Sequence, residues 1–174
     1  MRLAKLTAAE VRPYRELMLE AYANAPDAFT STPEERAAEP DSWWARRIED
    51  PNGKTASFGA FEADELVGTV ALEFASKPKT RHKALLIGMY VKPTARGAGV
   101  GAALVNEALA FVAARREIKV VTLTVTHGNT SAIRLYESAG FKQFGVEPMA
   151  ILGSAGYLSK VHMWRQVGGG EAAA

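Results

Sequence analysis

Residues 84–101 read ALLIGMYVKPTARGAGVG and join an apolar run to a glycine-rich loop. Residues 84–91 are nearly all apolar, which is typical of a central strand covered on both faces. Residues 102–117, which follow the loop, are rich in Ala, Leu, Val and Phe and predict a long helix. Loop glycines let several main-chain N–H groups approach a ligand closely at the positive end of that helix. The stretch therefore predicts a phosphate-binding turn between a strand and a helix.

Two familiar phosphate-binding patterns fit this loop poorly. A P-loop requires a lysine and a hydroxyl residue after its last glycine, and neither is present. The dinucleotide pattern G-x-G-x-x-A is matched by Gly97, Gly99 and Ala102. However, no acidic residue lies between Glu117 and Glu137 to bind a ribose hydroxyl after the next strand. We therefore favour a third pattern.

That third pattern, R-x-x-G-x-G, is satisfied by Arg96, Gly99 and Gly101, and the arginine adds a full charge with a fork of donors. Residues 129–141, NTSAIRLYESAGF, contain every fixed position of a second pattern, N-x-x-A-x-x-L-Y-x-x-x-G-F. In this order and context the two patterns resemble the GNAT superfamily of acyl-coenzyme A dependent N-acetyltransferases.

The resemblance implies an α/β (α+β) fold with one N-acetyltransferase domain over residues 1–167. Its sheet would be central, mixed and mostly antiparallel, with about seven strands. Helices would flank the sheet, which would be splayed at the cofactor site. The glycine-rich residues 168–174 are expected to form a disordered tail. Residue patterns predict strands at 1–6, 55–62, 66–74, 84–91, 119–126, 141–146 and 156–165, and helices ending near 24 and beginning near 41, 102 and 129.

The composition excludes several classes of site. The chain has no cysteine, which excludes a disulfide scaffold, a thiolate metal site and a cysteine nucleophile. His82, His127 and His162 lie far apart in the sequence, so we expect no metal site.

The charge and hydropathy patterns favour a soluble, cytoplasmic protein. We find no signal peptide at the start of this chain and no apolar run of the roughly 18 residues that a membrane span requires. Residues 77–96 contain six basic and no acidic residues. On charge alone this favours a solvated face, and the alternative is a site for a polyanionic ligand. No nucleic-acid recognition motif accompanies these charges, so we expect neither nucleic-acid nor membrane partners.

The resemblance implies acetyl-coenzyme A as the co-substrate, held by two parts of the chain. Main-chain groups of Met89 and Val91 would pair with the pantetheine amides as an added strand does. The loop after Arg96 would hold the pyrophosphate, and Asn129 would bind the pantetheine arm, cap its own helix, or do both. The implied cofactor-binding residues are Met89, Val91, Arg96, Gly97, Ala98, Gly99, Val100, Gly101 and Asn129.

Tyr136 is the implied catalytic residue. It lies seven positions after Asn129, so both side chains project from one face of a helix. In the superfamily the matching tyrosine acts as the general acid, and a phenol is suited to protonating a departing thiolate. The central strand lacks the acid that many relatives use as a base. Glu73 and His127 are candidates, and neither is assigned.

The implied reaction is direct acetyl transfer to a primary amine of a small molecule or of a peptide or protein N-terminus. The acceptor is expected to bind near the N-terminal helices and residues 26–40 and 147–157. Glu34, Glu35 and Glu39 could attract an amine there. The alternative is a non-catalytic acyl-coenzyme A binding sensor or interaction module. Many relatives dimerise, and the sequence leaves both a homodimer and a monomer open.

Overall fold

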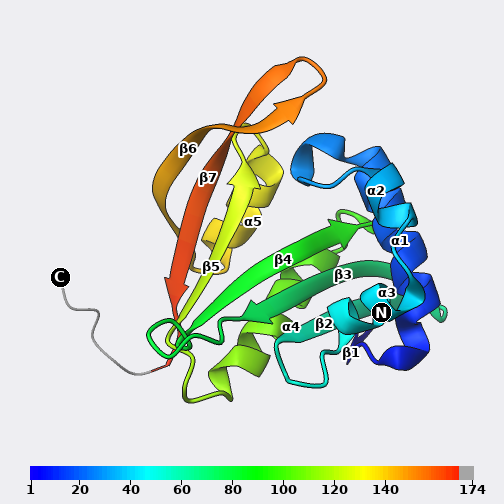
Figure 1. Cartoon of the computed structure of the whole chain (residues 1–174), viewed down its shortest axis with the longest axis horizontal. Coiled ribbons are helices and arrows are strands. Elements are labelled where there is room, and N and C mark those ends of the chain that lie inside the picture. The colour runs from blue at the N-terminus through cyan, green and yellow to red at the C-terminus, as the bar shows by residue number, and fades with distance from the viewer. Residues whose placement is uncertain (169–174) are drawn as a thin grey trace.

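The computed structural model describes residues 1–168, and a seven-stranded sheet runs through its centre (Figure 1). The strand order is β1-β2-β3-β4-β5-β7-β6. All neighbouring strands are antiparallel except β4 and β5, which are parallel. The mixed, mostly antiparallel sheet predicted from the sequence is therefore confirmed. The strands are β1 (Arg2–Lys5), β2 (Thr55–Glu62), β3 (Glu65–Phe74), β4 (Lys83–Val91), β5 (Val120–Thr126), β6 (Lys142–Gly153) and β7 (Gly156–Gln166).

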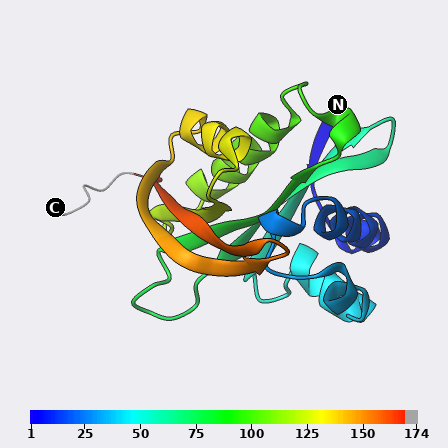
Figure 2. The same cartoon turned by 90° about the horizontal axis from the view of Figure 1, so that it is seen from above.

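Helices cover both faces of the sheet (Figure 2). One face carries α1, α2 and α3, and the other carries α4 and α5. The helices are α1 (Val11–Asn24), α2 (Pro33–Ala37), α3 (Asp41–Ile48), α4 (Val100–Ala113) and α5 (Thr130–Ser138). Single 3₁₀ turns at Ala8–Glu10, Pro26–Ala28 and Pro93–Ala95 precede longer elements or shape the loops. Among residues 1–168, no helix combines the length and the apolar character that crossing a bilayer requires.

Each face of the sheet has its own hydrophobic core. On α1, Tyr14, Leu17 and Met18 recur at helical spacing and are all buried, as their periodicity predicts. They pack with Trp44 of α3, which is fully buried, whereas the adjacent Trp43 is only partly buried. Burying each such side chain stabilises the fold by about 1.5–3 kcal/mol. The N-terminal helices are thereby held against the face of the sheet that borders the site.

The sheet opens between β4 and β5. These strands pair only over Lys83–Leu85 and Val120–Thr122, near their N-terminal ends, and then separate (Figure 1). On its other side β4 stays paired with β3, and β5 stays paired with β7. The separation leaves one main-chain edge of β4 without a strand partner beyond Leu85. The splay expected from the resemblance is confirmed.

Two predicted boundaries are wrong for local reasons. Helix α4 begins at Val100, directly after its left-handed N-cap Gly99, and ends at Ala113, four residues before the predicted end at residue 117. The chain turns there, and the Ile118 N–H donates a hydrogen bond to the Arg115 carbonyl oxygen. Strand β6 continues to Gly153, well past the predicted end at residue 146, through two register shifts and a positive φ at Met149. Of the predicted tail, residues 169–174 lie outside the described residues.

Candidate functional site

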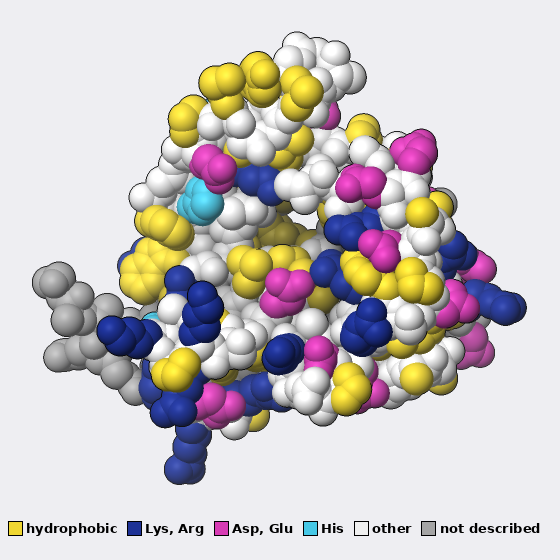
Figure 3. All heavy atoms as spheres, in the orientation of Figure 1, with side chains coloured by type: hydrophobic (Ala, Val, Ile, Leu, Met, Phe, Trp, Pro, Cys, Tyr) yellow, Lys and Arg dark blue, Asp and Glu magenta, His cyan; other side chains and the backbone are white. Residues whose placement is uncertain are grey.

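A cavity of about 290 Å³ lies where β4 and β5 separate. Figure 3 shows the surface hollowed there, between the β5–β7 side of the molecule and the α1–α2 side. The cavity is near the lower end of the roughly 300–1,000 Å³ found for small-molecule sites. On the sheet and α5 side it is lined by Leu86, Ile87, Gly88, Met89, Thr124, Val125, Thr126, Asn129, Ala132, Tyr136 and Lys160, and on the N-terminal side by Met18, Tyr22, Ala28, Phe29, Thr30, Ser31, Arg36 and Arg47.

A β-bulge in β4 faces this cavity. Thr69 of β3 pairs with Tyr90 and Ala71 pairs with Ile87, so two residues of β4 lie opposite the single residue between them. Gly88, at the bulge, has φ +61°. Glycine adopts this conformation without the steric cost that a side chain brings. The bulge bends the unpaired edge of β4 where Gly88 and Met89 line the cavity.

The glycine-rich loop continues from the end of β4. Arg96 is anchored at its start, because its Nε donates a hydrogen bond of 2.9 Å to the Val91 carbonyl oxygen. Its guanidinium carbon also lies 5.7 Å from the centroid of the Tyr90 ring. The side chain remains exposed. Arg96 therefore places a positive charge beside the loop.

Two glycines give the loop its path. Gly97 has φ +80° and Gly99 has φ +78°, and a Cβ at either position would meet no atom within 4 Å. Gly99 is the N-cap of α4, and the first hydrogen bond of the helix runs from Ala103 N to Gly99 O, at 3.0 Å. The N–H groups from Gly99 to Ala102 precede that bond and have no partner within the helix. An open cradle of donors thus lies at the positive end of α4.

The remaining predicted cofactor residues divide between the loop and the sheet. Ala98 and Val100 lie in the same turn at the start of α4. A Cβ on Gly101 would lie 3.1 Å from Met89 Cε and 3.3 Å from Leu135 Cδ2, so this glycine also allows α4 to pack closely. Val91 is paired with Gly68 of β3, and its carbonyl oxygen already accepts the bond from Arg96. The cavity therefore brings Met89, Asn129 and Tyr136 together, whereas Val91 and the loop lie outside its lining.

Asn129 begins α5 and lines the cavity. Its Oδ1 accepts a hydrogen bond of 3.2 Å from the Ala132 N–H and another of 3.1 Å from the Ser131 hydroxyl. The first of these caps the helix, as the sequence suggests. Because the side chain also borders the cavity, capping fixes the amide in place beside any bound molecule.

Asn129→Ala is expected to lower the free energy of unfolding by about 1 kcal/mol, because the Ala132 N–H loses its capping acceptor. Asn129→Asp keeps an acceptor at the same position and should remain close to the original stability. Urea denaturation of the two variants and the parent checks this. Equal stability of Asn129→Ala and the parent protein would contradict the capping role.

Tyr136 projects from α5 toward the cavity and is 6% exposed. Its ring packs edge-to-face on Phe141, with 5.9 Å between centroids. Its hydroxyl makes no hydrogen bond with any other residue of the described part of the chain. Burial raises the pKa of the Tyr136 phenol far above its ordinary value near 10. The hydroxyl is therefore protonated at physiological pH and is able to donate a proton to a ligand.

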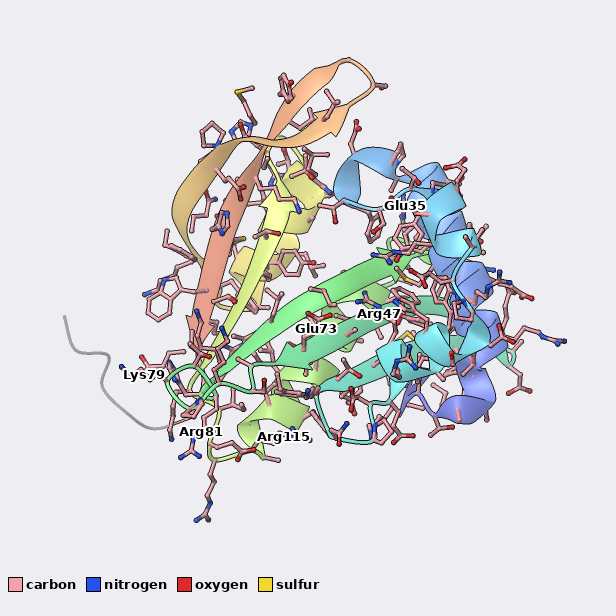
Figure 4. The ribbon with its side chains drawn as sticks, in the orientation of Figure 1. Glu35, Arg47, Glu73, Lys79, Arg81 and Arg115 are labelled. Atoms are coloured by element: carbon pink, nitrogen blue, oxygen red, sulfur yellow. The ribbon has the colours of Figure 1, made fainter. Side chains whose placement is uncertain are left out.

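Neither candidate base lines the cavity. The Glu73 carboxylate lies 3.1 Å from the Arg47 guanidinium, and Figure 4 shows the two side chains facing each other. His127 instead borders a neighbouring pocket together with Asn24 and Asp27. In the part of the chain that the structure describes, no carboxylate or imidazole is among the cavity-lining side chains.

The acidic residues expected to attract an amine are also held elsewhere. The Glu35 carboxylate accepts a hydrogen bond of 2.9 Å from the Thr32 N–H in the capping box of α2, and this bond lowers the pKa of Glu35. Glu39 lies 3.6 Å from Arg36. Neither of these carboxylates, nor Glu34, contributes to the cavity lining.

Sequence reasoning missed the basic residues of the site. Arg36, Arg47 and Lys160 all line the cavity, although they come from α2, α3 and β7. The segment around Arg36 is acidic, so its charge pattern indicates an ordinary solvated turn. These residues meet only because elements far apart in the sequence pack together, and a local sequence pattern does not predict such packing.

The sequence and its fold have clear counterparts among known proteins. The model of the acetyltransferase (GNAT) family matches residues 15–141. The mycothiol acetyltransferase of Salinispora tropica is 33% identical over 82 residues, which are 47% of this chain and 27% of that protein. An uncharacterised N-acetyltransferase of Methanocaldococcus jannaschii is 31% identical over 107 residues, which are 58% of this chain and 43% of that one. This chain thus spans less than half the length of either relative.

Solved structures share the whole fold at low sequence identity. A phosphinothricin acetyltransferase of Sinorhizobium meliloti, in complex with acetyl-coenzyme A, superposes with a TM-score of 0.85 at 22% identity. The alignment covers 99% of this chain and 91% of that one. The yncA protein of Salmonella typhimurium, a putative acetyltransferase with acetyl-coenzyme A, gives 0.79 at 20% identity and covers 100% and 98% of the two chains. Identity at this level shows a common fold.

Proposed function

Since the chain belongs to the acetyltransferase (GNAT) family, we propose that it transfers an acetyl group from acetyl-coenzyme A directly to a primary amine. We propose residues 1–167 as the N-acetyltransferase domain. The main observation behind the proposal is that the glycine loop, the unpaired edge of β4 and the cavity adjoin one another. One loop joins β4 to the donors at the start of α4, and the unpaired edge of β4 leads into the cavity that contains Tyr136.

The residues present fit acetyl-coenzyme A. The unpaired N–H groups from Gly99 to Ala102 and the exposed Arg96 guanidinium would hold the pyrophosphate. The free edge of β4 around Met89 would pair with the pantetheine amides. When bound, acetyl-coenzyme A supplies an acetyl group activated as a thioester.

Two side chains carry the proposed chemistry beside the thioester. The acceptor nitrogen forms the new N–C bond as the C–S bond breaks, and Tyr136 donates its phenolic proton to the departing sulfur. Asn129, fixed by its capping bonds, orients the pantetheine arm. We assign no base, because an amine that arrives uncharged needs none to attack. Its surplus proton leaves to water after the N–C bond forms, and the Tyr136 phenolate takes a proton back from water.

Calorimetry and thiol release test the proposal together. We expect acetyl-coenzyme A to bind the purified protein and an amine panel to include at least one substrate that releases coenzyme A. The chain has no cysteine, so a thiol reagent reports only the released product. No detectable binding at millimolar acetyl-coenzyme A would contradict the proposal.

A second candidate is a non-catalytic acyl-coenzyme A binding module. The absence of a carboxylate or imidazole from the described cavity lining favours it, as do the exposed apolar side chains of β6. Phe144 is 60% exposed and Leu152 is 72% exposed. Acetyl-coenzyme A binding without thiol release from any amine would support this candidate over the enzyme.

A further inference from the structure

The N-terminal wall of the cavity is positively charged. Arg36 and Arg47 belong to this wall, and Lys160 of β7 lines the opposite side. These three are the charged side chains of the whole cavity lining within residues 1–168, and all are cationic. The chain as a whole is nearly balanced, with 21 basic and 19 acidic residues. The charge of this wall is therefore a local feature, and such a wall in a cavity favours an anionic group on whatever enters it.

The two arginines are held in place by one tryptophan. The Arg36 guanidinium carbon lies 4.5 Å from the centroid of Trp43, and that of Arg47 lies 5.2 Å from it. These contacts keep two like charges at the same wall and reduce the conformational freedom that a ligand would otherwise have to restrict. Both charges also act on Tyr22 of the cavity, where they oppose the effect of burial, which raises the pKa of that phenol.

The ion pairs in the structure do not use all the hydrogen-bond donors of the cationic side chains that line the cavity. Arg47 has a close carboxylate partner in Glu73, at 3.1 Å, whereas the nearest carboxylate of Arg36 is Glu39, at 3.6 Å. The Arg36 Nε is buried and has no hydrogen-bond partner. Lys160 forms no ion pair with any described residue. Because Arg36 lines the cavity and its donors are not all paired, a bound carboxylate would find hydrogen-bond donors there.

The arginines and Tyr136 belong to different walls. Arg36 and Arg47 come from α2 and α3 on the N-terminal side, whereas Tyr136 comes from α5 beyond the splayed strands. A molecule that places an amine beside Tyr136 and an anion against Arg36 would lie between these two walls. The volume of about 290 Å³ favours a small molecule over a folded protein surface.

We propose that the acceptor is a free amino acid, whose carboxylate binds Arg36, with Arg47 on the same wall, while its amine is directed toward Tyr136. This inference rests on the proposed function. It disfavours polyamines, which the cationic wall would repel, and peptide N-termini, which carry a neutral amide where a free amino acid carries its carboxylate.

The test compares matched acceptors. The common L-amino acids and spermidine are screened by thiol release, and the best amino acid is compared with its carboxamide and with its decarboxylated amine. We expect kcat/KM to fall by about 10- to 100-fold when the carboxylate is removed. Binding is measured in parallel as the change in melting temperature of the protein saturated with coenzyme A, which cannot react.

Variants then locate the carboxylate site. Arg36→Gln should raise KM for the amino acid by about 10- to 100-fold and leave KM for its carboxamide and for acetyl-coenzyme A unchanged. Arg36→Lys should recover part of the loss, because it restores the charge. Arg46→Gln is the matched control, since Arg46 is an exposed arginine of α3 outside the cavity lining. Circular dichroism confirms that each variant is folded.

Different results count against different claims. The inference is overturned by equal use of the amino acid and its carboxamide, by acetylation of spermidine alone, or by equal effects of Arg36→Gln and Arg46→Gln. It is also overturned if no amino acid is a substrate and none stabilises the coenzyme A complex. The proposed function fails separately, if acetyl-coenzyme A itself does not bind.

Discussion

Gly99→Val is expected to lower the affinity for acetyl-coenzyme A by about 100-fold or more. Gly99 has φ +78°, and a β-branched residue strongly disfavours this conformation. The substitution would rotate the N-cap and displace the N–H groups that follow it from the pyrophosphate. Losing two charge-assisted hydrogen bonds at about 1.5–3 kcal/mol each accounts for an effect of this size. Isothermal titration calorimetry with acetyl-coenzyme A provides the measurement.

Gly53→Val is the matched control for this variant. Gly53 also has a positive φ, +69°, and a Cβ there would likewise meet no atom within 4 Å. It lies in the turn before β2, whereas the proposed cradle lies at the start of α4. Both variants should lose stability through backbone strain, and only Gly99→Val should lose affinity. An unchanged affinity of Gly99→Val for acetyl-coenzyme A would contradict the role of the glycine loop in binding the pyrophosphate.

Tyr136→Phe should reduce kcat by about 100- to 10,000-fold, the range for loss of a general acid or base. The affinity for acetyl-coenzyme A should change little, because the hydroxyl makes no hydrogen bond within residues 1–168 and the ring keeps its packing on Phe141. Steady-state kinetics with the best amine, combined with calorimetry, separates the two effects. Tyr157→Phe is the control, because Tyr157 is 62% exposed and does not line the cavity.

The pH dependence of the parent enzyme tests the same role. Burial raises the pKa of Tyr136, so the phenol keeps its proton as pH rises past its ordinary value near 10. Between about pH 8 and pH 10, the rate should therefore rise as the amine loses its proton, without a fall caused by Tyr136.

A kcat for Tyr136→Phe equal to that of the parent would exclude the phenol as the acid.

Sequence patterns predicted the strands and the glycine loop because their causes are local. The apolar residues 84–91 predict a central strand, and the left-handed conformation that begins α4 favours glycine at position 99. Asn129 and Tyr136 line the same cavity, as their spacing of seven residues predicts. For these elements, residues that are close together in the sequence are enough to predict the local structure.

On the acceptor side, the sequence indicated the segment 26–40 but not which of its charged side chains line the cavity. Arg36 reaches the cavity only because α1 and α3 pack against the sheet and Trp43 lies against its guanidinium. Glu73 was a reasonable candidate base from its strand position, yet its carboxylate is paired with Arg47. Both outcomes depend on contacts between residues far apart in the sequence, and a local pattern does not specify them.

The most direct test is a crystal structure of the protein with coenzyme A. We expect the pyrophosphate to lie against the main-chain N–H groups that follow Arg96, and the pantetheine arm to lie along the free edge of β4. The sulfur should lie within hydrogen-bonding reach of the Tyr136 hydroxyl. Coenzyme A bound elsewhere, with the turn before α4 vacant or that hydroxyl directed away from the sulfur, would contradict it.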